Sequence, residues 1–208
     1  VLACMAVVGL AGCSDDTTTT SDTTARPTTT ATPTTATVVA PPGPPTIRVG
    51  GNDPKDPNIA VLEFLPEKVK VATGTTVTWD IAGPEPHSVT FVPPGTKVPP
   101  STETDPSLFL PTPATAPYDG TTLVNSGVLP LGETSQVQKF SMSFAKTGTY
   151  TYYCVLHPNM VGTVTVSGDT QDSQQKITKT GNQEKAKYLK EGEAAKAKLL
   201  KAKPKTSK

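Results

Sequence analysis

From about residue 47 to residue 168, apolar and polar residues alternate with a period of two, which is typical of β-strands that bury one face. One such stretch, KVKVATGTTVTWDI (68–81), contains a turn at Thr73 and Gly74 between two alternating runs. We predict a hairpin here, with one face of both strands in the core. The side chains expected in that core are Val69, Val71, Val77, Trp79 and Ile81.

A second stretch, KFSMSFAKTGTYTYYC (139–154), has the same organisation around a central Thr-Gly turn, and the alternation returns in residues 163–166. Short strands, turns that carry glycine and no helical period together predict an all-β domain, a Greek-key β-sandwich or barrel of antiparallel strands. The inner faces of this second stretch are expected to carry Phe140, Met142, Phe144, Tyr150, Tyr152 and Cys154.

One segment, residues 93–136, interrupts the regular spacing of the strands. It is rich in proline and far longer than the usual connection between two strands. We expect a packed functional or covering loop that apolar side chains anchor to the domain. The candidate anchors are Leu108, Phe109, Leu110, Val128 and Leu129.

The first twelve residues, 1–12, form an apolar run that is too short to span a bilayer as a helix. Because neither a starting Met nor basic residues precede it, we interpret the run as a secretory signal peptide that is incomplete at its N-terminus. The sequence LAGC (10–13) resembles the lipobox of bacterial and archaeal lipoproteins, which implies that Cys13 is lipidated and becomes the first mature residue. The alternatives are an ordinary signal peptide cleaved nearby and a buried apolar helix.

Two segments that flank the domain differ from it in composition. Residues 13–46 consist largely of Thr and Pro and contain too few apolar groups to fold, so we expect a disordered tether. Residues 169–208 contain eleven Lys and five acidic residues, a net charge of +6, and are compatible with a helix up to Lys203, ahead of Pro204. Because their apolar residues are sparse, we favour a solvated, mobile tail over a docking element for an acidic partner or anionic lipid head groups.

The overall composition excludes some classes of function. The 208 residues carry a formal net charge of +1 and include 35% hydrophobic and 5% aromatic residues. Nothing in these averages favours nucleic-acid binding or several membrane spans. We therefore expect one folded domain, at residues 47–168, that acts as a monomer.

The candidate chemistry lies in YTYYCVLHPNMVGTVTV (150–166), where Cys154, His157 and Met160 are spaced three residues apart in a chain with only three Cys, two His and three Met. An exported chain that loses Cys4 and acylates Cys13 leaves Cys154 without a disulfide partner. A thiolate, an imidazole and a thioether are soft ligands, and the other histidine, His87 in GPEPHSVTF, would complete a set that suits copper. Zinc is the main alternative metal for these ligands, and Met142 is a less favourable axial ligand than Met160 because its position favours core packing.

Three segments, EFLPEKVKVATGTTVTW, PHSVTF and GTYTYYCVLHPNMVGTVTV, resemble the small blue copper proteins, the cupredoxins, over about residues 47–167. The Cys-x2-His-x2-Met spacing is similar to that of amicyanin and shorter than that of plastocyanin. The resemblance implies a cupredoxin fold with one type 1 copper ion, and its ligands would be His87, Cys154, His157 and Met160.

Two residues depart from the family pattern. Ser88 stands where many cupredoxins have an Asn that braces the cysteine loop, and we expect it to brace that loop only weakly. Leu156 stands where amicyanin and plastocyanin have Pro, so it keeps its N–H group. We hypothesise that this N–H donates to the Cys154 sulfur and raises the copper potential.

The expected function is one-electron transfer between redox proteins or membrane electron-transfer complexes. The carrier would be held on the extracytoplasmic side of a membrane, at the cell surface or in the periplasm, by a lipid on Cys13. The alternative is a copper-binding module for storage, buffering or delivery. We expect no enzymatic activity, because multicopper oxidases and copper nitrite reductases need further histidines and this chain has only two. A metal-free adhesion domain would leave the grouping of Cys154, His157 and Met160 unexplained.

Overall fold

A computed structural model of the chain describes residues 43–97, 105–130 and 138–202. The signal peptide, Cys13 and most of the tether predicted from the sequence lie outside the described residues, as do parts of the insertion and the last six residues. The strands are β1 (Thr46–Asn52), β2 (Ala60–Leu65), β3 (Lys68–Val71), β4 (Thr76–Ile81), β5 (Thr90–Phe91), β6 (Val124–Asn125), β7 (Lys139–Ser143), β8 (Gly148–Tyr153) and β9 (Val161–Val166). The helices are the 3-10 helix η2 (Pro106–Phe109) and the α-helix α1 (Gln174–Lys201).

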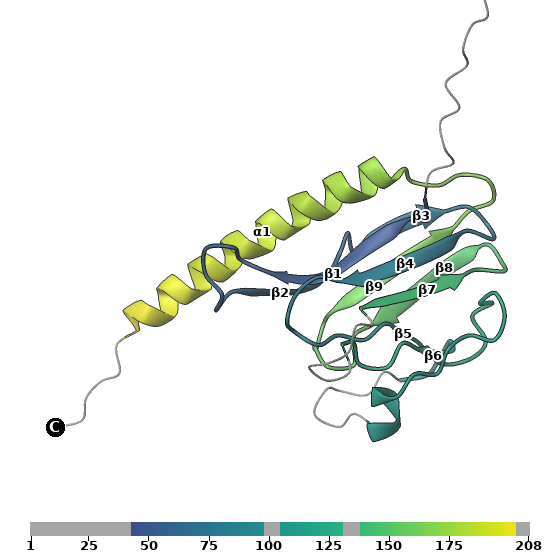
Figure 1. The fold of residues 1–208 in the computed structure, drawn as a ribbon, viewed down its shortest axis with the longest axis horizontal. Coiled ribbons are helices and arrows are strands. Elements are labelled where there is room, and N and C mark those ends of the chain that lie inside the picture. Colours follow the sequence, from purple (N-terminus) through teal and green to yellow (C-terminus); the bar gives the residue numbers. More distant parts are fainter. Residues whose placement is uncertain (1–42, 98–104, 131–137, 203–208) are drawn as a thin grey trace, which may run out of the picture. The chain divides into compact units, whose positions relative to one another are not determined.

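The strands form two sheets, and helix α1 lies beside one of them (Figure 1). The first sheet has the order β2-β1-β4-β7, and the second has the order β3-β9-β8-β5-β6. This arrangement confirms the expected β-sandwich. The expectation of purely antiparallel strands was wrong, because β1 pairs with β4 and β3 pairs with β9 in parallel.

The predicted hairpin over residues 68–81 was also wrong, because its two strands belong to different sheets. The turn between them crosses from one sheet to the other and bonds to both sides. Thr73 N–H donates to the Gly168 carbonyl, and Gly74 N–H donates to the Phe144 carbonyl. Gly74 has φ +80°, a left-handed conformation that glycine adopts without strain. Alternation buries one face of each strand in either arrangement, so it does not indicate which strands pair.

The space between the sheets is filled by aromatic side chains. Trp79 on β4 contacts Phe91 on β5 and Tyr152 on β8, with ring centroids 5.7 and 5.2 Å apart in edge-to-face geometry. Phe64 on β2, in the same sheet as Trp79, also packs against Tyr152, with ring centroids 4.6 Å apart. Aromatic pairs of this geometry each contribute about 0.5 to 1.5 kcal/mol beyond burial. Two aromatic side chains of the facing sheet therefore fix β8, the strand that leads to Cys154, through Tyr152.

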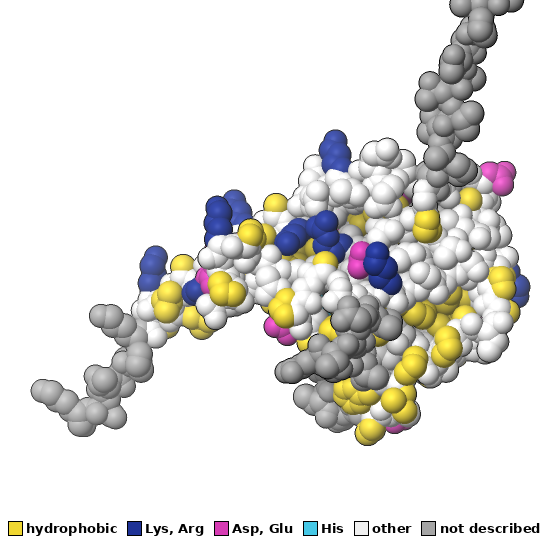
Figure 2. All heavy atoms as spheres, in the orientation of Figure 1, with side chains coloured by type: hydrophobic (Ala, Val, Ile, Leu, Met, Phe, Trp, Pro, Cys, Tyr) yellow, Lys and Arg dark blue, Asp and Glu magenta, His cyan; other side chains and the backbone are white. Residues whose placement is uncertain are grey.

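The described parts of the proline-rich insertion pack on the domain and extend it. Strand β6 pairs with β5, so the insertion supplies the edge of the second sheet. Of the anchors expected from the sequence, Leu108 and Leu129 are buried and Val128 is partly buried, whereas Phe109 is 38% and Leu110 is 60% exposed. Figure 2 shows hydrophobic side chains on the surface at the bottom of the view, where Figure 1 draws η2. The prediction of a packed loop is thus confirmed for two anchors and wrong for Phe109 and Leu110.

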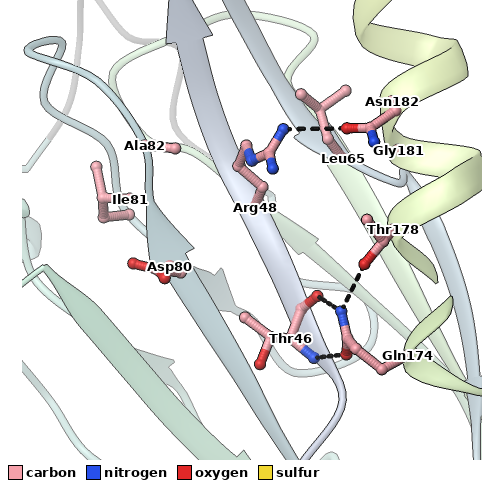
Figure 3. A pocket seen from close by; sticks show the side chains of 10 residues that line it. All are labelled: Thr46, Arg48, Leu65, Asp80, Ile81, Ala82, Gln174, Thr178, Gly181 and Asn182. Carbon is pink, nitrogen blue, oxygen red and sulfur yellow. Dashed lines mark hydrogen bonds between the residues drawn. The ribbon is translucent and has the colours of Figure 1, made fainter.

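The helix that the sequence allowed up to Lys203 is present as α1, but it is docked on the domain, whereas a solvated, mobile tail was favoured. The helix begins after Ser173, whose side chain caps it by accepting a hydrogen bond from Lys176 N–H. Its first half packs on the β1–β2 side of the sandwich and buries Ile177 (Figure 1). Figure 3 shows Gln174 bonded to both the N–H and the carbonyl of Thr46, so the helix start is tied to the start of β1.

The second half of α1 is held by fewer side chains. Lys196 forms an ion pair with Asp56, and beyond it Leu199 and Leu200 are among the most exposed hydrophobic residues that the structure describes. Among the described residues, no helix combines the length and the apolarity that crossing a bilayer requires.

Replacing Gly181 tests how closely α1 is docked. In an exposed helix, Gly→Ala stabilises by about 1 kcal/mol. At position 181, however, an added Cβ would lie 2.8 Å from the carbonyl carbon and oxygen of Leu65. We therefore expect Gly181→Ala to lower the free energy of unfolding by about 1 to 3 kcal/mol, measured by urea denaturation. The exposed neighbour Gln183→Ala should be nearly neutral, and a stabilised Gly181→Ala protein would contradict the docked arrangement.

Candidate metal centre

His87 is fixed by backbone pairing on the segment between β4 and β5. Its N–H donates to the Leu129 carbonyl and its carbonyl accepts from Leu129 N–H, both at 2.8 Å. The insertion therefore holds the backbone of His87 from one side. The side chain is only 1% exposed, so the imidazole points into the protein.

The other candidate ligands lie on the turn that follows β8. Cys154 N–H donates to the Met160 carbonyl at 3.1 Å, and Met160 N–H donates to the His157 carbonyl at 3.2 Å. Asn159 adopts φ 68°, a left-handed conformation that Asn tolerates better than most residues. These features close the turn tightly. Cys154 and Met160 are buried, and His157 is half-buried.

Three donor atoms meet between the two segments. The Cys154 sulfur lies 3.4 Å from His157 Nδ1 and 3.9 Å from His87 Nδ1, and the two Nδ1 atoms lie 3.1 Å apart. A point equidistant from all three lies ~2.0 Å from each, within the ~2.0 to 2.3 Å range of metal bonds to imidazole and thiolate. Two imidazoles and one thiolate in a triangle are the donor set typical of blue copper centres. The residues present therefore fit a copper ion.

Met160 and Met142 occupy different environments. Met160 is 1% exposed within the turn that carries Cys154 and His157, whereas Met142 lies on β7 opposite Val77, with its side chain in the core. This agrees with the expectation that Met142 serves core packing. The assignment of Met160 as the axial ligand stays a prediction.

Burial keeps both imidazoles neutral. Burial first, and the neighbouring His157 second, lower the pKa of His87 from 6.5 to about 4. Burial also lowers the pKa of His157, against the opposing attraction of the Glu85 carboxylate. A metal binds imidazole only in its neutral form, so the site is ready for a metal at neutral pH.

The far side of the His87 ring rests on a glycine that the sequence reasoning did not single out. A Cβ on Gly50 would lie 2.3 Å from His87 Nε2, and Gly50 has φ +70°. Nε2 is buried and has no hydrogen-bond partner among the described residues. Gly50 and Gly51 form an irregularity in the β1–β2 register. The double glycine inside an alternating strand was the available signal, because such residues mark a bulge or a close approach.

The hydrogen bond to the Cys154 sulfur comes from a different amide than expected. Ser88 N–H donates to Sγ at 3.4 Å, whereas the hypothesis from the sequence assigned this role to Leu156. The reason is spatial: Ser88 follows the His87 ligand position and is completely buried against the cysteine, while Leu156 is on the partly exposed side of the turn.

The structure shows how Ser88 braces the cysteine loop, a role that the sequence reasoning expected to be only weak. Its hydroxyl oxygen accepts a hydrogen bond from Val155 N–H at 2.9 Å, directly after Cys154. The side chain of Ser88 is short, but complete burial brings it within reach. Ser88 therefore contacts the loop through both its backbone and its side chain.

Comparison with known proteins agrees with this geometry. Residues 55–167, more than half of the chain, match the family of copper binding proteins described as the plastocyanin/azurin family. The chain belongs to this family, and copper is the metal of its site. A comparison with curated proteins gives no match.

Similar solved structures include several of amicyanin. A reduced Cu(I) form of an amicyanin variant at pH 4 is 23% identical in sequence. The match covers 62% of this chain and 87% of the amicyanin chain, with a TM-score of 0.39. A Cu(I) form of another variant is 25% identical with the same coverage and a TM-score of 0.38. Amicyanin from Paracoccus versutus (Thiobacillus versutus) is 20% identical, with 62% and 85% coverage and a TM-score of 0.38.

The lowered pKa of His87 makes the stability of the metal-free protein depend on pH. The unfolded chain binds a proton at this histidine near pH 6.5, whereas the folded chain binds it only near pH 4. The contribution of His87 to stability is therefore fully present above pH 6.5 and is lost as the pH falls toward 4. We expect a loss of about 3 kcal/mol at most, measured by urea unfolding at a series of pH values.

His87→Gln is the control for this prediction, since it has no imidazole to protonate. Its free energy of unfolding should fall less than that of the wild type between pH 7 and pH 4. An equal fall in both proteins would show that other groups cause the pH dependence.

Proposed function

We propose that the protein is a type 1 copper electron carrier in which His87, Cys154, His157 and Met160 hold the ion. The observation that supports this most strongly is the triangle formed by the Cys154 sulfur and the two Nδ1 atoms, whose edges measure 3.1 to 3.9 Å. When bound, copper supplies one-electron chemistry between Cu(I) and Cu(II).

The surrounding residues favour rapid electron exchange because they keep the donors in place. The Leu129 pairing fixes the backbone of His87, and Gly50 limits movement of its ring. Ser88 and the closed turn fix Cys154. Donors that cannot move far give a similar ligand geometry in both oxidation states, so little rearrangement accompanies electron transfer.

The route for electrons to partners lies through His157 in this proposal. Its side chain is half-buried, and the neighbouring Leu156 and Val161 are also partly exposed. A small apolar surface of this kind suits the brief docking of redox proteins or membrane electron-transfer complexes. We propose no enzymatic role, because the proposed site uses both histidines of the chain and leaves none for a second copper centre.

We further propose that the carrier is attached to a membrane on the extracytoplasmic side by a lipid on Cys13. The support is the LAGC sequence at residues 10–13 and the Thr- and Pro-rich residues that follow it. A diacylated anchor gives stable attachment, and a tether of this composition would let the domain reach partners in the same membrane.

Copper loading of the full chain tests the electron-carrier proposal. We expect an intense visible absorption from thiolate-to-Cu(II) charge transfer and fast electron exchange with a small redox mediator. Cys154→Ser should abolish the absorption, while the core variant Met142→Leu, which nearly conserves volume, should retain it. A wild-type protein without the cysteine-dependent band would contradict the proposal. Slow electron exchange with ready release of copper to a chelator would favour the storage or delivery alternative instead.

Cell fractionation tests the anchor. When the chain is produced as an exported protein, the wild type should remain with the membranes, and Cys13→Ser should move to the soluble fraction because it has no thiol to acylate. Cys4→Ser is the matched control and should stay with the membranes. Membrane retention of the Cys13→Ser protein would contradict the lipid anchor.

A further inference from the structure

Three polar side chains are completely buried beside the metal centre without being metal ligands. Ser88 and Asn125 have no exposed surface and Thr90 is 1% exposed. Burying polar groups is costly unless each finds a hydrogen-bond partner. All three do so here, by bonding to one another and to the backbone at both ends of the series.

These residues form one continuous series of hydrogen bonds, which we call the hydroxyl chain (Ser88, Thr90 and Asn125). Val155 N–H donates to Ser88 Oγ at 2.9 Å. Ser88 Oγ and Thr90 Oγ1 lie 3.1 Å apart, and Thr90 Oγ1 donates to Asn125 Oδ1 at 2.8 Å. Because the Thr90 proton is used toward Asn125, the Ser88 hydroxyl is the donor to Thr90. Every bond therefore points in the same direction, away from the cysteine loop.

The far end of the hydroxyl chain lies in the proline-rich insertion. Asn125 is in β6, and its Nδ2 donates to the carbonyls of Leu108 and Leu110 at 2.6 and 3.1 Å. Its backbone also pairs with Thr112 in both directions. One asparagine thus connects the η2 region of the insertion to the residue that follows Cys154. This connection is separate from the pairing of Leu129 with His87.

We propose that Thr90 and Asn125 are positioning residues for the copper site, and that through them the insertion fixes the Val155 amide and the adjacent Cys154. Asn125 orients Thr90, Thr90 fixes the rotamer of Ser88, and Ser88 holds the Val155 N–H. The effect on copper rests on the proposed function, but the effect on the loop exists in the metal-free protein. Outer groups of this kind orient metal ligands and set the properties of the metal.

The direct test measures hydrogen exchange of the Val155 amide by NMR in the metal-free full chain. Thr90→Val removes the hydroxyl and nearly conserves the shape, so Val155 should exchange about three- to tenfold faster, the effect of one hydrogen bond. Thr90→Ser keeps the hydroxyl and should restore slow exchange. If the Thr90→Val protein does not fold, Thr90→Ala takes its place. It also lacks the hydroxyl, so the Val155 amide should again exchange faster than in the wild type.

Ser126→Ala is the matched control. Ser126 is also buried in the insertion and accepts from Val89 N–H, but it is not part of the hydroxyl chain. We expect it to leave Val155 exchange unchanged. In addition, Ser88→Ala and the double variant Ser88→Ala/Thr90→Val should accelerate Val155 exchange equally. Once Ser88 has no hydroxyl, Thr90 is no longer connected to the Val155 amide, so its replacement adds nothing. Unchanged exchange in the Thr90 variants, or equal acceleration by Ser126→Ala, would overturn the proposal.

The copper-loaded protein provides a second readout. The midpoint potential should shift in Thr90→Val and in Asn125→Leu, return toward the wild type in Thr90→Ser, and stay unchanged in Ser126→Ala. If the midpoint potentials do not follow this pattern, the proposed effect on copper is refuted, even where the Val155 exchange rates change as expected. Failure of the wild type to form a cysteine-dependent copper band would instead refute the proposed function, while the exchange experiment would still test the hydroxyl chain.

Discussion

The burial of the His87 imidazole in a fixed orientation is the constraint on which the metal centre depends. Backbone pairing with Leu129 holds one side of this residue, and the close approach of Gly50 leaves its ring little freedom on the other. The same burial keeps the imidazole neutral and directs Nδ1 toward the Cys154 sulfur. An exposed histidine would become protonated below about pH 6.5 and would be free to turn, so burial both extends the neutral form to lower pH and fixes the direction of the ring.

The rest of the sandwich places the turn that follows β8 against this histidine. Phe64 and Trp79 of the facing sheet hold β8 through Tyr152, and the two backbone bonds of Met160 close the turn that carries His157. Ser88 joins the two halves, since it follows His87 in the sequence and bonds to both Cys154 and Val155. The insertion and helix α1 add support at the edges: the insertion bonds beside His87, and α1 covers the β1–β2 side.

The fold class could be predicted from the sequence because alternation and glycine turns are typical of a β-sandwich. The grouping of His87, Cys154 and His157 could be predicted because Cys and His are rare in this chain and stand at informative spacings. The sequence did not allow the pairing of strands to be predicted: alternation looks the same whether Val71 and Val77 belong to one sheet or to two. Helix docking was missed for a related reason. Gly181 and Gln174 are unremarkable in a lysine-rich helix, and only the opposing backbone of Leu65 and Thr46 gives them a role.

The neighbours of the ligands were harder to predict than the ligands themselves. A hydroxyl such as that of Ser88 is an effective brace only where burial brings it within bonding distance, and burial depends on the whole fold.

The description of the site as a copper centre built on His87 is tested most directly by X-ray absorption spectroscopy of the copper-loaded full chain. We predict a first shell with one short copper–sulfur bond and two imidazole nitrogens, and loss of one nitrogen in His87→Gln. A first shell unchanged by His87→Gln, or one without sulfur, would contradict the account.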